Sequence, residues 1–203
     1  MAFNIDAFSA NINRDGLSFK SDYQVIITPP AQLSRLYPTS DLSLRASKAD
    51  IPGRSIQTVP TRHVVGPETQ VAYNSSLLQI STTFIADKKL NIKRYFEAWQ
   101  DIAIGNFRML SPLYKSKQFN IGYYSDYVGT VTIYQYDRET QKVAYQCKML
   151  ECYPVTINPL DVDWESTATH DIGVTWNYRY FTDISISNSF NSRERVNAEF
   201  FNG

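Results

Sequence analysis

The stretch GTVTIYQYDRETQKVAYQCKMLECYPVTINPLDVDW, residues 129–164, decides the fold of this 203-residue chain. From Val143 to Leu150 the residues alternate between two sets, one of valine, tyrosine, cysteine and methionine and one of alanine, glutamine, lysine and leucine. A period of two over such a length is typical of strands that bury one face. The polar residues 137–140 (DRET) predict a turn between two antiparallel strands. The stretch therefore predicts a long β-hairpin, which builds a surface and carries no catalytic cluster.

The segment HDIGVTWNYRYFT, residues 170–182, predicts a third strand of the same kind. Apolar and polar residues again alternate along it, so one face is expected to be buried. That face consists of Ile172, Val174, Trp176, Tyr178 and Tyr180.

The first half of the chain contains further strand candidates. Residues 21–28 form the first, which ends at Pro29-Pro30 because proline cannot donate to a sheet ladder. Residues 31–40 are expected to form a loop. The segment 61–76 has Gly66-Pro67 at its middle and too few apolar residues to fill a core, so we predict an extended hairpin or flap. The other strand candidates are residues 42–47, 54–60 and 77–86.

One helix is predicted after Asp87, which is a good N-cap residue. Its apolar residues recur at helical spacing and form one stripe, which must pack against a sheet or a neighbour. Gly105 stands where a helix C-terminus is expected, so the helix would span about 17 residues, roughly five turns. The stripe consists of Ile92, Tyr95, Phe96, Trp99, Ile102 and Ala103.

Length and composition predict one globular domain with short appended segments. We expect an N-terminal arm (residues 1–20), a β domain (21–183), within which residues 106–125 form a loop, and a polar C-terminal tail (184–203). Twenty basic and twenty acidic residues give a net charge of zero. A protein that binds DNA tightly through its phosphates usually has an excess of basic residues, and this chain has none. The sequence contains neither a signal peptide nor an apolar run that could span a membrane.

The two cysteines predict free thiols in a reducing compartment. Cys147 and Cys152 lie five positions apart on one predicted strand. At about 3.3 Å per residue they would stand about 16 Å apart on opposite faces, too far to pair with each other. With only two histidines, His63 and His170, they form no persuasive zinc site.

Other residues that could carry chemistry are better explained by structure. Glu97 and Asp101 fall on the polar face of the predicted helix and indicate a solvated surface. The acidic run at residues 161–165 lacks the glycine and terminal glutamate of a calcium-binding EF-hand, so an acidic strand edge is favoured. The glycines match no phosphate-binding loop. We therefore expect no catalytic residue, no metal and no cofactor.

Tyrosines leave one alternative open. The chain has 14 of them, including a group at residues 123–136 that could stack on sugars or bases. Tyrosine is more often a sheet or interface residue, which is the favoured interpretation. A β-sandwich that binds glycans through tyrosine-rich loops remains the alternative from a different functional class.

The order of these elements resembles the tail tube proteins of contractile-tailed bacteriophages over residues 22–182. The segment ADIPGRSIQTVP (residues 49–60) is followed by a flap ending in YNSS (73–76) and by a helix with the spacing FxxWQ (96–100). The stretch from Tyr153-Pro154 to Asp163-Trp164 and the first strand around residues 23–25 complete the likeness.

The resemblance implies a mainly β fold, an antiparallel β-sandwich or barrel with one flanking α-helix and extended hairpins. Subunits of this family form hexameric rings whose hairpins join into an inner β-barrel, and stacked rings make a channel through which DNA passes without specific binding. The implied partners are further copies of the chain, the tail sheath protein, and baseplate and tail-terminator proteins. The implied location is the tail of the virion, assembled in the host cytoplasm. A baseplate protein that starts the tube, or one that terminates it, is the alternative within this fold. A related export-tube protein of a bacterial secretion or contractile injection system is a further variant.

Within this family the residues receive three hypothetical roles. The helix contributes Ile92, Phe96 and Trp99 to the core. The strands at residues 58–73 and 128–150 are wall candidates, with Thr130, Thr132, Tyr134, Tyr145 and Lys148 as the channel-wall residues. The flap between subunits or rings consists of Thr61, Arg62, His63, Val64, Val65, Gly66, Pro67, Val71 and Tyr73.

Overall fold

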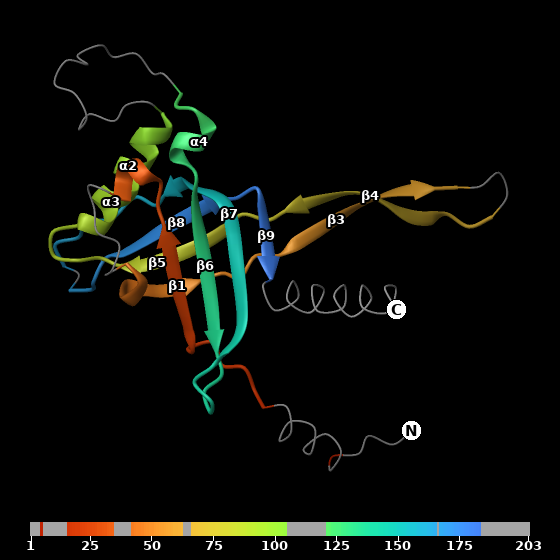
Figure 1. The fold of residues 1–203 in the computed structure, drawn as a ribbon, viewed down its shortest axis with the longest axis horizontal. Helices are drawn as coiled ribbons and strands as arrows, with labels where there is room; N and C mark the ends of the chain where they lie inside the picture. The colour runs from red at the N-terminus through yellow and green to blue at the C-terminus, as the bar shows by residue number, and fades with distance from the viewer. Residues whose placement is uncertain are drawn as a thin grey trace, which may run out of the picture.

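The computed structural model describes residues 5, 16–34, 42–62, 66–104, 121–165 and 167–183. The fold is mainly β, as predicted, with antiparallel strands and few helices (Figure 1). The helical elements are α2 (Ala31–Ser34), the 3-10 turn η1 (Ser43–Arg45), α3 (Asn91–Ala103) and α4 (Tyr124–Tyr127). The strands are β1 (Tyr23–Thr28), β2 (Ala46–Ala49), β3 (Arg54–Thr61), β4 (Thr69–Leu77), β5 (Ile80–Ile85), β6 (Gly129–Tyr136), β7 (Val143–Ile157), β8 (Asp171–Asn177) and β9 (Tyr180–Asp183).

Seven strands form one sheet, and β3 and β4 form a separate two-stranded hairpin. The order in the large sheet is β1-β6-β7-β8-β5-β2, and β9 pairs with β7 outside this path. The predicted hairpin of residues 129–164 is confirmed as β6 and β7, joined by a turn at residues 137–142. Figure 1 shows β6 and β7 as the longest strands of the body, with the β3–β4 hairpin projecting away from it.

The long strand β7 belongs to two parts of the sheet. Its first ten residues pair with β6, and its last five pair with β8. The change occurs at Glu151, an extra residue that opposes no partner in β6 and has a φ of 55°. A bulge of this kind bends a strand and increases its twist. It also shifts the alternation, so that Met149 and Cys152, three positions apart, both lie in the core.

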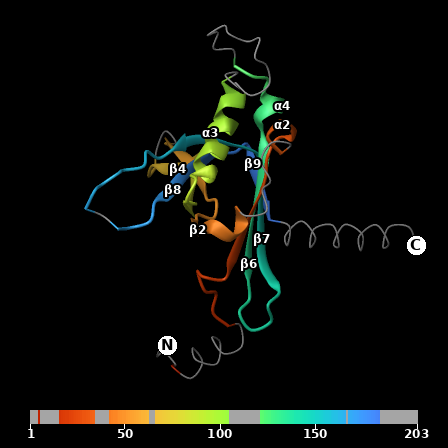
Figure 2. The same ribbon diagram turned by 90° about the vertical axis from the view of Figure 1, so that its left-hand side faces the viewer.

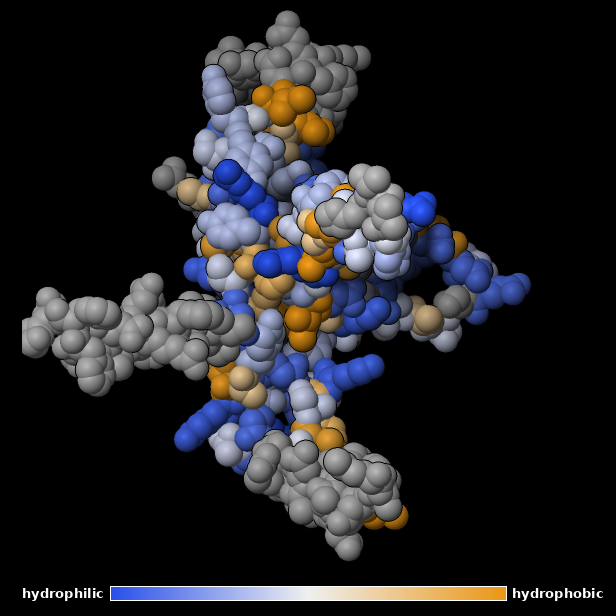
Figure 3. All heavy atoms as spheres, turned by 90° about the vertical axis from the view of Figure 1, so that its right-hand side faces the viewer, coloured by the Kyte–Doolittle hydropathy of each residue, from blue (hydrophilic) through white to orange (hydrophobic). Residues whose placement is uncertain are grey.

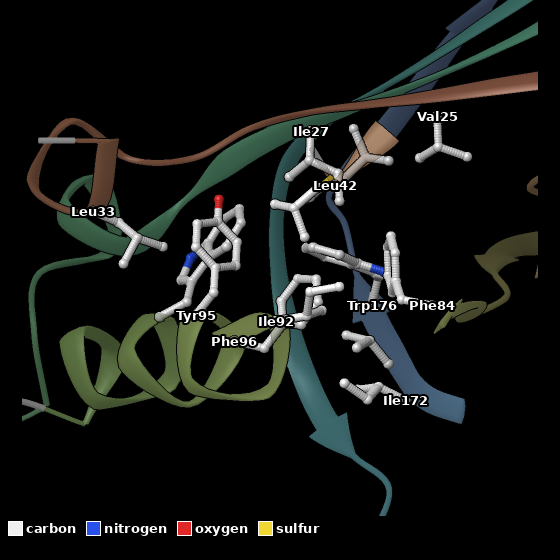
Figure 4. Packing of buried hydrophobic residues seen from close by; sticks show 14 of the residues in the cluster. Val25, Ile27, Leu33, Leu42, Phe84, Ile92, Tyr95, Phe96, Ile172 and Trp176 are labelled. Carbon is white, nitrogen blue, oxygen red and sulfur yellow. The ribbon is translucent and has the colours of Figure 1, made fainter. Parts of the chain in front are cut away.

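One hydrophobic core lies between the two parts of the sheet and α3. Its centre is a chain of aromatic rings from β5, α3 and β8, with centroids 5.2 Å apart for Phe84–Phe96, 5.7 Å for Phe96–Trp176 and 5.4 Å for Trp99–Trp176 (Figure 4). Tilted and edge-to-face pairs of this kind add stabilisation beyond the area that they bury. The predicted apolar stripe of the helix is therefore confirmed as its core face.

Both buried tryptophans have a hydrogen-bond acceptor. The indole N–H of Trp176 donates to the hydroxyl of Thr82 at 2.8 Å, and that of Trp99 donates to the carbonyl of Tyr127 at 2.6 Å. Since an unpaired polar group is costly to bury, these two bonds fix the rings, and they tie β8 to β5 and α3 to the end of α4.

Three predictions about element boundaries were wrong. The helix begins at Asn91 and spans 13 residues, because Leu90 has a left-handed φ of 52°. Asp87 still contributes, since its carboxylate accepts a hydrogen bond from the N–H of Ile92 at 3.3 Å. Residues 43–45 form a 3-10 turn instead of a strand, and residues 31–34 form a helical turn that places Leu33 in the core. Gly105 and most of the predicted loop at 106–125 lie outside the described residues.

The third predicted strand is divided into two. β8 ends at Asn177 and β9 begins at Tyr180, where the chain leaves β8 and pairs with β7. The buried face continues through Tyr178, but Tyr180 is exposed, so the predicted face ends before it. A hydrogen bond of Tyr178 explains the break between the two strands. The hydroxyl of Tyr178 donates to the carbonyl of Leu78 at 2.7 Å, at the end of the hairpin.

The two cysteines are free and buried, but not on opposite faces of a regular strand. The bulge at Glu151 lies between them and changes the alternation. Burial raises the pKa of the Cys152 thiol to about 12, so at neutral pH it is protonated and unreactive.

We predict that Gly129→Ala strongly destabilises the subunit. A Cβ atom there would lie 2.5 Å from the carbonyl oxygen of Thr28 and 2.7 Å from a ring carbon of Trp99. Overpacking of this kind typically costs about 1–3 kcal/mol in the free energy of unfolding, measured by urea titration. Gly53→Ala is the control, because its Cβ would meet only Leu78, at 3.6 Å. Equal stability of the two variants would contradict the packing described.

We also predict that Thr82→Val lowers the free energy of unfolding by about 1–3 kcal/mol, since it leaves the buried N–H of Trp176 without an acceptor. Thr83→Val makes the same change on the opposite face of β5, where the free energy of unfolding should fall by less than about 0.5 kcal/mol. Thermal unfolding of both variants is the measurement. A Thr82 variant as stable as the Thr83 variant would show that this hydrogen bond contributes nothing.

Candidate functional site

The β3–β4 hairpin is a part of the described chain that has no core of its own. Every residue of β3 is exposed, and β4 is exposed until its last two residues. The hairpin projects from the body, and Figure 3 views the molecule from the side of its tip. Two-stranded hairpins are only marginally stable in water when nothing packs against them. The exposed apolar side chains on it are Ile56, Val59, Val71 and Tyr73.

Apolar residues occur on both faces of this hairpin. Val59 opposes Val71 across the strands, so these two share a face. Tyr73, the extra residue of a bulge, bonds through its hydroxyl to the side chain of Gln57 at 3.1 Å on that same side. The neighbouring pair Thr58–Ala72 points the other way, as does Ile56. Both faces can therefore be buried only by a neighbour that encloses the hairpin.

The strands of the hairpin have few charges. Residues 55–61 of β3 and 69–77 of β4 contain no charged side chain, although Arg54 and Arg62 flank β3. Monomeric proteins usually protect exposed strand edges with lysine or other charges. Their absence here indicates strands that become covered.

The strands β1, β6, β7 and β9 form a second surface, which we call the outer face; most of its side chains are exposed or half-buried, and Thr132 is buried. One row across these four strands consists of Ile26, Thr132, Lys148 and Thr182. The next row consists of Thr28, Thr130, Leu150 and Tyr180. In the third, Tyr134 accepts a hydrogen bond from Gln146 at 3.2 Å. Lys148 is the single charged residue in these rows, so the outer face is polar but almost uncharged.

The predicted wall residues do not all share this face. Thr130, Thr132, Tyr134 and Lys148 lie on the outer face, whereas Tyr145 is paired with Gln135 on the opposite one. Burial raises the pKa of Tyr145 to about 12, as expected of a side chain that points inward. A wall formed by the outer face would thus contain four of the five residues. Their role in a channel stays a prediction.

The predicted flap residues lie on the hairpin as far as the structure describes them. Thr61 ends β3, Arg62 follows it, and Val71 and Tyr73 belong to β4. Gly66 has a φ of 141° and lies with Pro67 near the tip. His63, Val64 and Val65 lie outside the described residues. The flap is thus the distal part of a hairpin that starts earlier, at Arg54.

Edge strands of the large sheet are also available for pairing. Among the described residues, β1 pairs only with β6, β9 only with β7 and β2 only with β5. Each strand therefore has one row of backbone groups without a ladder partner. Such edges are templates for pairing with another chain.

An ion pair at the bulge was not predicted from the sequence. The guanidinium of Arg179 lies 3.2 Å from the carboxylate of Glu151, and the backbone N–H of Arg179 donates to Leu150 at 3.2 Å. Burial, together with a hydrogen bond to Glu151, raises the pKa of Tyr124 to about 12. No sequence signal marks this contact, because a left-handed glutamate cannot be recognised from residue types.

The acidic run at 161–165 is not a strand edge, contrary to the prediction. β7 ends at Ile157, and the described residues 158–165 and 167–170 form a loop. Pro159 could have indicated this, since proline interrupts sheet ladders. On the helix, the predicted solvated face is confirmed for Glu97, which is exposed and pairs with Lys93.

The described residues contain no cluster of histidine, cysteine, aspartate or glutamate able to hold a metal ion. No helix in the described parts of the chain has the length and hydropathy needed to cross a membrane.

Comparisons with known proteins agree with this description. A family model described as phage tail tube protein matches residues 18–183. Among curated proteins, none matches the chain. Several solved structures share the fold at low sequence identity, and three chains from cryo-EM structures illustrate this.

A chain of the PVC sheath/tube terminator of an extracellular contractile injection system has 10% identity and a TM-score of 0.58, with 83% of this chain and 97% of that chain covered. A chain of the anti-feeding prophage cap has 10% identity and a TM-score of 0.55, with 85% and 97% covered. One from the PVC sheath-tube complex has 10% identity and a TM-score of 0.53, with 90% and 98% covered.

The family match includes the whole described β domain, from the segment before β1 to the end of β9. Its members are structural proteins and not enzymes. This chain belongs to the phage tail tube protein family.

Proposed function

We propose that the chain is the ring-forming subunit of a phage tail tube, and that stacked hexameric rings of it make a channel for DNA. The observation that carries this proposal is the β3–β4 hairpin, which is exposed on both faces. A neighbouring subunit or ring supplies the surface that covers it. Full burial of a valine or isoleucine contributes about 1.5–3 kcal/mol, so covering Ile56, Val59 and Val71 contributes several kcal/mol to assembly.

The direction of the strands supports a continuous wall. β1, β6, β7 and β9 alternate in direction, since each pairs antiparallel with the next. A rotation about the tube axis keeps the direction of β1, so β9 of one copy meets β1 of the next as an antiparallel pair. A ring closed in this way leaves no free strand edge at β1 or β9. Six copies are proposed from the family resemblance, and the similar anti-feeding prophage baseplate is described as sixfold symmetrised.

The outer face suits the surface of a conduit. If it lines the channel, DNA meets threonine, tyrosine and glutamine side chains and one lysine from each subunit. Tight binding of DNA needs many cationic contacts to phosphates, which this face does not offer. DNA would therefore pass without being held. Around the tube we place the sheath, with baseplate and terminator proteins at its ends, in a virion tail assembled in the host cytoplasm.

A protein that initiates or terminates the tube is the alternative within the same fold. Chains of a tube terminator and of a cap are as similar in structure as a chain of a sheath-tube complex. Electron microscopy of the purified protein separates the two roles. Long hollow tubes identify the main tube subunit, whereas single rings that never stack identify an initiator or terminator.

We predict that Val71→Lys gives a folded subunit that does not assemble. The side chain is exposed in the isolated subunit, so the free energy of unfolding should change by less than about 0.5 kcal/mol. In the assembly the new charge would be buried opposite Val59 without a partner. Sedimentation and negative-stain microscopy should show monomers.

Leu44→Lys is the matched control, because Leu44 is an exposed apolar residue far from the hairpin. It should assemble like the unmodified protein. Tubes of normal length from the Val71 variant would refute the role given to the hairpin.

Cysteine crosslinking tests the proposed edge pairing. Ile26→Cys in β1 and Thr182→Cys in β9 occupy the same row of the outer face, at its two edges. The two native cysteines are buried, so they should not react in the folded protein. With a short bismaleimide, tubes of the double variant should give a ladder of crosslinked copies that ends at the ring number, expected to be six.

Each single variant should remain monomeric on the same denaturing gel. A double variant that forms tubes but does not crosslink would show that β1 and β9 of adjacent copies are not neighbours. The contact between adjacent copies would then have to be sought between other strands.

A further inference from the structure

The loop between β7 and β8 projects from the body on the side of α3, away from the outer face (Figure 2). We call residues 158–165 and 167–171 the Trp164 loop. Its two ends are fixed by backbone hydrogen bonds of 2.9 Å, from Asn158 to Gly173 and from Ala86 to His170. Leu160 packs against the core near its start. The base of the loop is thus tied to the sheet, while its middle extends outward.

The middle of the loop presents apolar side chains to solvent. Trp164 is 102% exposed and Val162 is 88% exposed. The carboxylate of Asp163 accepts a hydrogen bond from the N–H of Glu165 at 3.0 Å, which forms a local turn around Trp164. A fully exposed indole contributes nothing to the stability of the subunit. Tryptophan is, however, enriched among residues that dominate the binding energy of protein interfaces.

The loop is strongly acidic as well. Asp161, Asp163, Glu165 and Asp171 are its charged residues, and the sequence from 158 to 171 contains no lysine or arginine. Three of these aspartates line a cavity of about 450 Å³ between the two limbs of the loop, together with His170. Carboxylates around a cavity attract a cationic side chain, and an adjacent indole can stack on it.

A second copy of the same loop is excluded as the occupant by its charge, because four carboxylates would face four others. The hairpin of another copy is a poor match too, since its strands carry no charge between residues 55 and 61 or between 69 and 77. The complementary surface carries lysine or arginine beside an apolar pocket. Neither of these two surfaces of another copy offers that chemistry, so a basic surface of a different protein is the occupant to test.

We propose that the Trp164 loop is the docking site for a basic segment of a protein that surrounds the tube. This inference depends on the proposed function, in which the outer face lines the channel and the opposite side of the subunit points outward. Trp164 would enter an apolar pocket of the partner, and the aspartates of the loop would pair with lysine or arginine at the rim. The sheath subunit of the same phage is the partner to test.

Tryptophan fluorescence tests the proposal in the full-length protein. Of the three tryptophans, Trp99 and Trp176 are buried, so acrylamide should quench mainly Trp164. Assembly into tubes should leave the acrylamide quenching constant of Trp164 unchanged to within about twofold. Addition of purified sheath protein to the tubes should reduce this constant at least threefold. Shielding by tube assembly alone would overturn the proposal, because Trp164 would then lie between copies of the subunit.

Substitution gives an independent readout by co-sedimentation of sheath protein with preformed tubes. Trp164→Ala should weaken sheath binding at least tenfold, and Asp161→Asn with Asp163→Asn should weaken it and reduce its dependence on salt. Leu44→Ala, at another exposed apolar residue, should bind normally. Normal binding by the Trp164 variant would refute the docking site. Electron microscopy of each sample distinguishes this outcome from a failure of the proposed function, in which no tubes form at all.

Discussion

The bend of β7 at Glu151 is the constraint on which the rest of the structure depends. The left-handed residue lets one 15-residue strand pair with β6 and β9 at its beginning and with β8 at its end. The two parts of the sheet thereby enclose the aromatic core together with α3. Arg179 forms an ion pair with the carboxylate of Glu151, and its backbone N–H donates to the carbonyl of Leu150. These two contacts hold the break between β8 and β9 against the bulge.

The buried core contains no residue of β3 or β4, and only Leu77, at the end of β4, packs against it, so the rest of the hairpin is free to act in assembly. Trp99 and Trp176 are buried and hydrogen-bonded within the body, while the hairpin leaves it as an exposed pair of strands. A subunit of this kind has a stable part that folds alone and an appended part that gains its contacts from a neighbour. The uncharged strands, the open edges of β1 and β9 and the family match all indicate the same structural role.

Periodicity was sufficient to predict the elements that contribute a regular apolar face. The β6–β7 hairpin, the stripe of α3 and the first strand followed from spacing alone, and the flap followed from its lack of core residues. Spacing could not predict the bulge at Glu151 or the division after Asn177, because both depend on backbone dihedral angles and distant partners. The acidic run at residues 161–165 alternates like a strand in sequence, although it lies in a loop. The sequence alternation already separated Tyr145 from Lys148, but only the register assigns each to a side of the sheet.

The central claim is that the β3–β4 hairpin is covered only by assembly, and hydrogen–deuterium exchange tests it most directly. In the isolated subunit, the amides of residues 54–61 and 69–77 should exchange far faster than those of β5, β6 and β8. In tubes they should become protected by at least about a hundredfold, which corresponds to about 2.7 kcal/mol of stabilisation at 25 °C, while protection of the core strands changes much less. A hairpin that is equally protected before and after assembly, or equally unprotected in both states, would contradict the account.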